Sequence, residues 1–189
     1  EQGRRRVGDV EARPRPWSTV FRIPTDGGTA WSKANGPGPF HEGPLLEVMA
    51  RAGATAVLLP LAVDLERGWL LLDDGGATLR SLPAPDGRNG DTDLARWERI
   101  LADCADLQRG MEVHVEAMLA VGVPDLRPER LPETLARLLD TDELWARVDR
   151  ADRPATDRAR RRLRQLAPVV ADMTGSLAAS PIAATIDHG

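Results

Sequence analysis

Cysteine and histidine are scarce in this chain of 189 residues, and their scarcity argues against disulfide-stabilised and zinc-binding proteins. The single cysteine, Cys104, cannot form an internal disulfide, which is typical of the reducing cytoplasm, where we expect this chain. Cys104 falls on an apolar helical stripe and is predicted to be a buried structural thiol. The three histidines lie without the spacing of zinc ligands, so no metal-ligating residue is predicted.

Long apolar runs are also missing. The longest, at residues 56–63, is far shorter than the roughly 20 residues of a membrane-spanning helix, and no signal peptide opens the chain, so we expect no membrane association. The arginine-rich segment at residues 160–164 is predicted to be a solvated face rather than a nucleic-acid contact, and the run at residues 4–6 is too short to indicate nucleic-acid binding. The net charge is −4, and no aromatic residues are interleaved with the arginines.

Lysine is nearly absent as well. Lys33 is the only lysine, and the other 24 of the 25 Lys and Arg residues are arginine. A coding bias toward arginine explains most of this imbalance, and Lys33 is then one codon that escaped it. The alternative is a site that requires a compact charge on a flexible stem, such as one between phosphate oxygens.

The residues around Lys33 favour the second interpretation. Residues 15–24 alternate like a half-buried strand, and the Asp-Gly and Gly-Gly pairs within residues 25–29 are typical of a hairpin turn. A second predicted strand, residues 30–34, carries the lysine. A Gly- and Pro-rich break follows, and residues 41–52 have the apolar spacing of a short helix.

Glu42 falls in the first turn of that helix. A strand lysine followed by a helix glutamate is the ion pair with which phosphoryl-transfer enzymes hold a lysine against the α- and β-phosphates of ATP. Glu42 also has a simpler role, because an acidic residue is favourable at a helix N-terminus. The two roles are compatible.

With these residues in place, the chain resembles the aminoglycoside phosphotransferase-like branch of the protein-kinase-like fold. The resembling segments are RPWSTV at 15–20, WSKANGPG at 31–38, HEGPLL at 41–46, PLAVD at 60–64 and GWLLLDDGGATL at 68–79. The resemblance implies an α+β fold in which residues 1–80 form a kinase-like N-lobe, an antiparallel sheet plus one helix. Residues 81–93 are then a linker, and residues 94–189 are the helical part of a C-lobe truncated before its catalytic loop.

The resemblance also implies a nucleotide-binding site for ATP or GTP. The implied residues are Lys33, Glu42, Trp17, Ser18, Thr19, Asp73 and Asp74. Lys33 would contact phosphates and Glu42 would hold the lysine, while residues 17–19 would lie in the hairpin that covers the phosphates. No G-x-G-x-x-G motif is present, so this hairpin departs from the protein-kinase pattern.

Two apolar runs, residues 56–63 and 69–72, are predicted to be buried strands. The second run ends at Asp73 and Asp74, which the resemblance makes the hinge that faces an adenine edge. The alternative is an ordinary hairpin followed by a solvated loop.

The rest of the chain is predicted to be helical. A long helix capped by Asp91 or Thr92 ends near Gly122. Its apolar stripe is Leu94, Trp97, Leu101, Cys104, Leu107, Met111, Val115 and Met118. Shorter helices are predicted at residues 131–139 and 142–148, and a longer one, kinked at Pro168, at residues 153–177. The inner face predicted for the longer helix is Leu163, Leu166, Val170, Met173 and Leu177.

Residues 182–189 read as a short strand that ends in His188 and Gly189. In the family that the chain resembles, such a strand leads into a His-Gly-Asp catalytic loop, and later residues hold Mg²⁺. The chain stops one residue before that aspartate, so His188 is only the edge of the motif and the Mg²⁺ ligands are absent. We therefore expect weak nucleotide affinity and no measurable kinase activity from these 189 residues alone.

Two functions remain at this stage. The first is a small-molecule kinase that transfers the γ-phosphate to a hydroxyl of its acceptor. Four acidic residues would attract a cationic acceptor, or they form a solvated helix face; they are Asp103, Asp106, Glu112 and Glu116. The second is a non-catalytic nucleotide-binding or protein-interaction module. A truncated C-lobe would leave apolar helix faces exposed, which favours self-association into a homo-oligomer.

Overall fold

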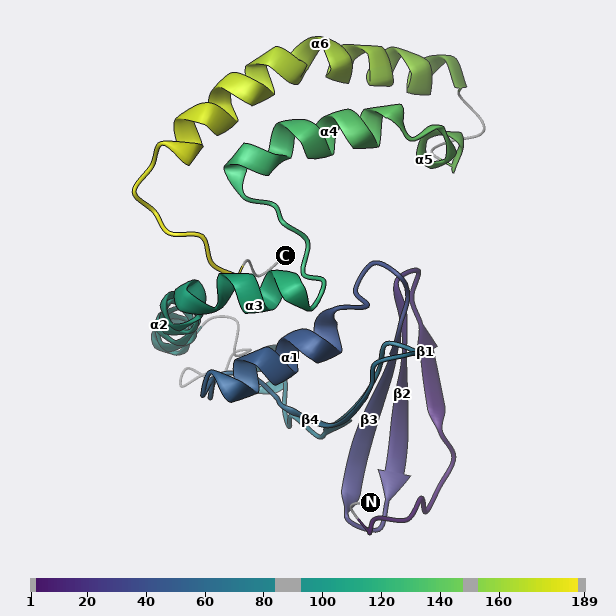
Figure 1. Cartoon of the computed structure of the whole chain (residues 1–189). Coiled ribbons are helices and arrows are strands. Elements are labelled where there is room, and N and C mark those ends of the chain that lie inside the picture. The colour runs from purple at the N-terminus through teal and green to yellow at the C-terminus, as the bar shows by residue number, and fades with distance from the viewer. Residues whose placement is uncertain (1–2, 84–92, 148–152, 187–189) are drawn as a thin grey trace. The chain divides into compact units, whose positions relative to one another are not determined.

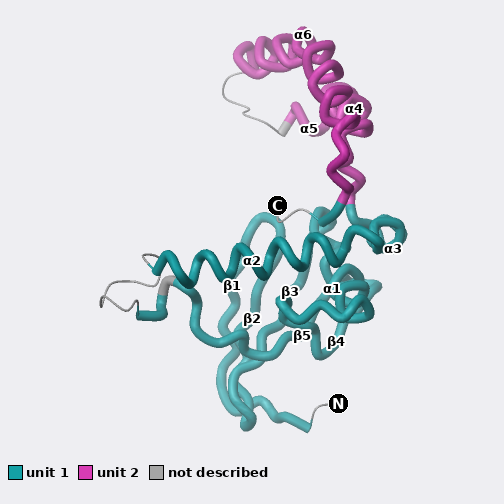
Figure 2. Tube along the Cα trace, turned by 90° about the vertical axis from the view of Figure 1, so that its left-hand side faces the viewer, with its two compact units in different colours: residues 1–123, 185–189 teal, residues 124–184 magenta. Residues whose placement is uncertain are grey.

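The computed structural model describes residues 3–83, 93–147 and 153–186, in which an antiparallel sheet is followed by helices (Figure 1). This arrangement confirms the predicted α+β class. The chain divides into two compact units, residues 1–123 with 185–189 and residues 124–184 (Figure 2). The first helices after the sheet therefore belong to the same unit as the sheet, whereas the predicted linker lies earlier, at residues 81–93.

Unit 1 is built on a five-stranded antiparallel sheet with the strand order β1-β2-β3-β5-β4. Its strands are β1 (Glu11–Pro14), β2 (Ser18–Thr25), β3 (Gly28–Asn35), β4 (Pro60–Asp64) and β5 (Trp69–Asp73). The predicted hairpin forms between β2 and β3, where Thr25 pairs with Gly28. Gly28 has a φ of +112°, a conformation that favours glycine. Sequence analysis missed β1, because its four residues are all exposed and show no apolar alternation.

The strand predicted at residues 56–63 is shorter and begins later than expected. β4 begins at Pro60, and the preceding Leu58 and Leu59 are 45% and 40% exposed. Proline has no N–H to donate to a neighbouring strand, and the first residue of an edge strand, where Pro60 lies, is a position that tolerates it. The apolar run alone therefore overestimated the strand.

Helix α1 (Glu42–Arg51) agrees with the prediction at residues 41–52. Its inner face forms the core of unit 1 with the two helices that follow the sheet. The buried members of this core are Val48, Met49, Met111 and Met118. The core thus joins α1 to the helical region by methionine and aliphatic contacts, which fill irregular space well.

The long helix predicted to end near Gly122 is divided in the structure. It consists of α2 (Leu94–Met111), a 3-10 turn η3 (Glu112–His114) and α3 (Val115–Ala120). Its N-cap is Asp93, whose side chain accepts from the Arg96 N–H at 3.0 Å; Asp91 and Thr92, the predicted caps, lie outside the described residues.

Only the second half of the predicted stripe is core. Leu94 is 74% exposed and Leu101 is 62% exposed, while Cys104 is half-buried rather than buried. The core residues of α2, Leu107 and Met111, lie at its C-terminal end. α2 crosses α1 rather than running alongside it (Figures 1 and 2), so the first half of α2 lies away from this core.

Residues 182–186 are not a strand, contrary to the prediction. Thr185 and Ile186 bind to α2 instead: the Gln108 side-chain amide donates to the Ile186 carbonyl at 3.1 Å, and the Thr185 hydroxyl donates to the Gln108 carbonyl. Ile186 packs against the core of unit 1. A strand needs a neighbouring strand edge for its backbone groups, and here the partner is a helix.

Unit 2 is helical. Its elements are η4 (Pro128–Arg130), α4 (Leu131–Asp140), α5 (Asp142–Arg147) and α6 (Arg153–Ala178), and one further 3-10 turn, η1 (Leu79–Ser81), belongs to unit 1. The face predicted to be the inner face of α6 is largely exposed, with Met173 at 60% and Leu177 at 57%. The buried residue of α6 is Thr174, whose hydroxyl donates to the Val170 carbonyl at 2.8 Å.

Arginine side chains explain the different face of α6. Arg160 Nε donates to the Leu139 carbonyl at 2.6 Å, and Arg164 donates to the same carbonyl at 3.1 Å. Leu139 lies in the last turn of α4, where carbonyls lack helical partners and a positive charge is favourable. The arginine-rich segment is therefore not simply a solvated face.

Every helix in the described ranges is too short or too polar to cross a membrane.

Candidate functional site

Lys33 lies on β3, an internal strand of the sheet, and contacts the first residue of α1. It pairs with Val20 on β2 and with Leu70 on β5. The Lys33 Nζ lies 2.5 Å from Oε2 of Glu42, and the two side chains are 24% and 32% exposed. The structure thus brings together the two residues that sequence analysis paired, in a contact largely covered by protein.

The connection between β3 and α1 is short because it starts with a close backbone approach. The Gly36 N–H donates to the Trp17 carbonyl at 2.8 Å. A Cβ atom on Gly36 would lie 3.0 Å from that oxygen, so any other residue would force the two segments apart. At the other end, His41 makes no side-chain cap, and Glu42 supplies the negative charge that a helix N-terminus favours.

Asn35 is a third residue in contact with the Lys33–Glu42 pair, and sequence analysis did not identify it. Its side-chain Nδ2 donates to Glu42 Oε2 at 3.0 Å, the same oxygen that Lys33 contacts. Asn35 follows Lys33 by two residues on one strand, so the two side chains lie on the same face. The two-residue spacing of Lys33 and Asn35 on a predicted strand could therefore have indicated from the sequence that Asn35 lies beside the lysine.

The face of the sheet that carries Lys33 also carries Arg13 and Arg22, which both pair with Glu11, at 3.6 and 3.2 Å. Arg13 is opposite Val20, and Val20 is opposite Lys33. Directly opposite residues share a face, so Arg13 and Lys33 stand on one face two strand spacings apart, about 10 Å. Trp31 lies on this face as well, and the Arg13 guanidinium is 5.7 Å from the centre of its ring. Arg13 was missed because β1 was not predicted.

The residues predicted to cover the phosphates, 17–19, do not all lie on the face of the sheet that carries Lys33. Ser18 is buried and pairs with Asn35, on the face of Lys33. Thr19 pairs with Ala34 and therefore lies on the opposite face. Trp17 is 59% exposed and precedes β2. The structure brings Ser18 to the Lys33 face and does not bring the Thr19 side chain there.

The predicted hinge residues are engaged within the protein. Both Asp73 carboxylate oxygens accept from the Arg4 guanidinium, at 2.8 and 3.0 Å. The Asp74 N–H donates to Asp73 Oδ1 at 2.9 Å, and Asp74 Oδ1 accepts from the Trp31 indole N–H at 3.3 Å. The Asp74 N–H and both carboxylates are thus already paired within the protein, and the role of these residues as a hinge stays a prediction.

The Arg4–Asp73 contact predicts a pH dependence. The Arg4 hydrogen bonds lower the pKa of Asp73 from 3.8 to about 2, with a smaller contribution from the Asp74 N–H. Because the folded-state pKa is depressed, this contact stabilises the fold above pH 3.8, and the stabilisation is lost as the pH falls from about 4 to 2. We expect Asp73→Asn to lower Tm at pH 6 and to have no effect near pH 2, measured by thermal unfolding followed by circular dichroism. An equal difference in Tm at both pH values would contradict the assignment.

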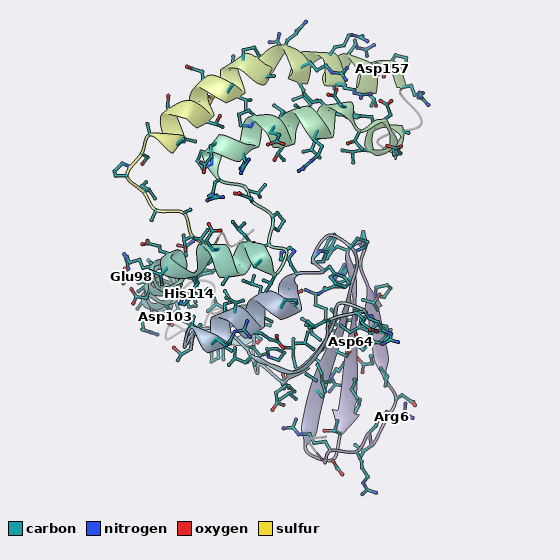
Figure 3. All side chains as sticks on the ribbon, in the orientation of Figure 1. Arg6, Asp64, Glu98, Asp103, His114 and Asp157 are labelled. Atoms are coloured by element: carbon teal, nitrogen blue, oxygen red, sulfur yellow. The ribbon has the colours of Figure 1, made fainter. Side chains whose placement is uncertain are left out.

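A separate cavity of about 380 Å³ lies in unit 1 beyond the C-terminal end of α1. Its lining includes Ala52 to Ala56, Asp103 and Asp106, and Figure 3 shows Asp103 on α2. Glu42 is at the opposite end of α1, about 15 Å away for ten residues of helix. The cavity is therefore distinct from the Lys33 site. Glu112 and Glu116 are exposed and do not line it, so the four acidic residues do not gather around one opening.

His188 lies outside the described residues, so its place at the edge of a catalytic-loop motif stays a prediction. Within residues 3–83, 93–147 and 153–186, no three His, Cys, Asp or Glu side chains gather in a way that could hold a metal ion. Comparisons with models of protein families, with curated proteins and with solved structures find no match to this chain.

Proposed function

We propose that this chain carries the nucleotide-phosphate-binding lobe of a phosphotransferase that moves the γ-phosphate of ATP or GTP to a hydroxyl of a small molecule. The resemblance to the aminoglycoside phosphotransferase-like family suggests this activity. The observation that supports it most directly is the 2.5 Å contact between Lys33 Nζ and Glu42 Oε2, formed between an internal strand and the first turn of a helix.

The proposed chemistry matches what these side chains can do. Phosphoryl transfer depends on positioning and on electrostatic stabilisation more than on covalent chemistry by the protein. Lys33 would bind oxygens of the α- and β-phosphates, and Glu42 would keep the ammonium group in place. Arg13 adds a positive charge on the same face, about 10 Å away across two strands, where it lies 3.6 Å from the Glu11 carboxylate. A bound nucleotide supplies the phosphoryl group that is transferred.

The residues fit a polyphosphate better than they fit a metal ion. Three cations share the face of the sheet: Lys33, Arg13 and Arg22. The carboxylates beside them, Glu11 and Glu42, are already in ion pairs with these cations, whereas a bound Mg²⁺ would need carboxylate oxygens of its own. No carboxylate cluster suitable for a metal lies in the parts of the chain that the structure describes. We expect the described residues to support nucleotide binding, and this binding to be weak, because one charge-assisted contact contributes only about 1.5–3 kcal/mol.

The single lysine makes a site-specific test practical. Lys33 carries the only side-chain amine, so acylation followed by peptide mass spectrometry reports on this site and separates it from the N-terminal amine. We expect millimolar Mg-ATP or Mg-ADP to slow the acylation of Lys33, because the phosphates would cover the ammonium group. AMP should protect much less, because it lacks the β-phosphate.

Equal acylation rates with and without Mg-ATP would contradict the proposal. Mg-GTP in the same assay tests the choice of nucleotide, and inorganic tripolyphosphate shows whether the phosphates alone account for protection. Transfer of radiolabelled phosphate to any member of a panel of hydroxyl compounds would establish the reaction. Protection of Lys33 without transfer would favour the alternative, a non-catalytic nucleotide-binding module.

A further inference from the structure

Asn35 is the last residue of β3, and its amide is almost fully buried beside the Lys33–Glu42 contact. Its exposed fraction is 9%. Nδ2 donates to Glu42 Oε2 at 3.0 Å, while the buried Oδ1 has no hydrogen-bond partner in the described part of the chain. The backbone N–H of Asn35 donates to the Gly68 carbonyl at 3.3 Å, which fixes the end of the strand.

The amide has one acceptable orientation. Turning it by half a rotation would place Oδ1 against Glu42 Oε2, and two acceptor oxygens would then face each other. The observed orientation keeps the bond to the carboxylate and leaves Oδ1 unpaired. An unpaired buried acceptor is unfavourable, and an apolar side chain of similar size would avoid it. Stability alone therefore does not explain an asparagine at this position.

Two donors from one strand converge on one oxygen. Lys33 Nζ and Asn35 Nδ2 both reach Oε2 of Glu42, from the same face of β3. With a single donor the glutamate could rotate about its own bonds and carry the lysine ammonium with it. With two donors anchored on a paired strand, the position of the carboxylate is fixed relative to the sheet.

We propose that Asn35 is a positioning residue, which holds the Glu42 carboxylate so that the Lys33 ammonium stays where a nucleotide phosphate would meet it. This inference rests on the proposed function for the nucleotide. Its geometric part, the hold on Lys33, does not depend on any ligand. Asn35 acts through Glu42 and itself touches neither phosphate nor acceptor.

The test compares Asn35→Leu and Asn35→Ala with the wild-type chain and with a control, Ser32→Ala. Ser32 is on the same strand, but on the opposite face of the sheet. The first readout is the acylation rate of Lys33 without nucleotide. We expect both Asn35 variants to react about three- to tenfold faster, because the ammonium is held less firmly, and the control to react at the wild-type rate.

The second readout separates positioning from folding. We expect Asn35→Leu to change Tm little, because the variant removes an unpaired buried acceptor together with the bond to Glu42, and to weaken Mg-ATP binding by a similar three- to tenfold factor. Wild-type acylation rates in both Asn35 variants would overturn the inference, whatever their Tm. Failure of Mg-ATP to protect the wild-type lysine would instead count against the proposed function, because the first readout needs no nucleotide.

Discussion

Replacing Lys33 by methionine is expected to weaken Mg-ATP binding about 10- to 150-fold. Methionine keeps much of the apolar stem and removes the ammonium group. A hydrogen bond to a charged group contributes about 1.5–3 kcal/mol, and about 1.4 kcal/mol changes Kd tenfold. Titration followed by tryptophan fluorescence measures this effect, because Trp31 lies on the same face of the sheet as the lysine.

The control for this prediction is Lys33→Arg, which keeps the charge and changes its shape. We expect a smaller loss of affinity, because a guanidinium is planar and longer than a compact ammonium. Both variants should fold, since partly exposed ion pairs contribute at most about 1 kcal/mol to stability. Unchanged affinity in Lys33→Met, with wild-type Tm, would show that the lysine does not bind the nucleotide.

The variant Glu42→Gln tests whether Glu42 acts on nucleotide binding through Lys33. Its effect on affinity and that of Lys33→Met should not add, because removal of the ammonium leaves the glutamate nothing to hold. Fully additive losses would mean that Glu42 acts on the nucleotide independently of Lys33. The combined variant therefore distinguishes a coupled pair from two neighbouring charges.

The parts of the site that could be predicted depend on residues near one another in the chain. Lys33 and Glu42 are nine positions apart, and a strand, a glycine-rich break and a helix lie between them with clear local patterns. The hairpin before Lys33 follows from Asp-Gly and Gly-Gly pairs, whose turn preference is intrinsic. Local backbone preferences therefore carried both the fold around the lysine and the contact itself.

Features that depend on distant pairing could not be predicted in this way. Arg13 shares the face of Lys33 only through the register of β1 on β2, and β1 has no apolar alternation. Residues 182–186 have the apolar character of a strand, but Thr185 and Ile186 pair with Gln108 on a helix. The packed face of α6 is likewise chosen by contacts with α4, which outweigh the more apolar face of the isolated helix.

Gly43→Val is expected to destabilise the protein by about 1–3 kcal/mol, because there is no room for a side chain between α1 and the sheet. A Cβ atom on Gly43 would lie 2.6 Å from a methyl carbon of Leu70 and 2.7 Å from one of Val63. Leu70 is only 2% exposed, and the Val63 side chain has few alternative rotamers, so neither moves aside easily. Thermal unfolding should show a Tm lower by about 2–4 °C for each kcal/mol.

The matched control is Gly175→Val on α6, where no atom lies within 4 Å of the added Cβ. An exposed helical substitution of this kind should change stability by no more than about 0.5 kcal/mol. Because Gly43 directly follows Glu42, overpacking at Gly43 should also displace the carboxylate and speed the acylation of Lys33. Loss of stability without faster acylation would mean that the helix adjusts while the ion pair persists. Both effects together would show that the close approach of α1 to β4 and β5 holds Glu42 against the lysine.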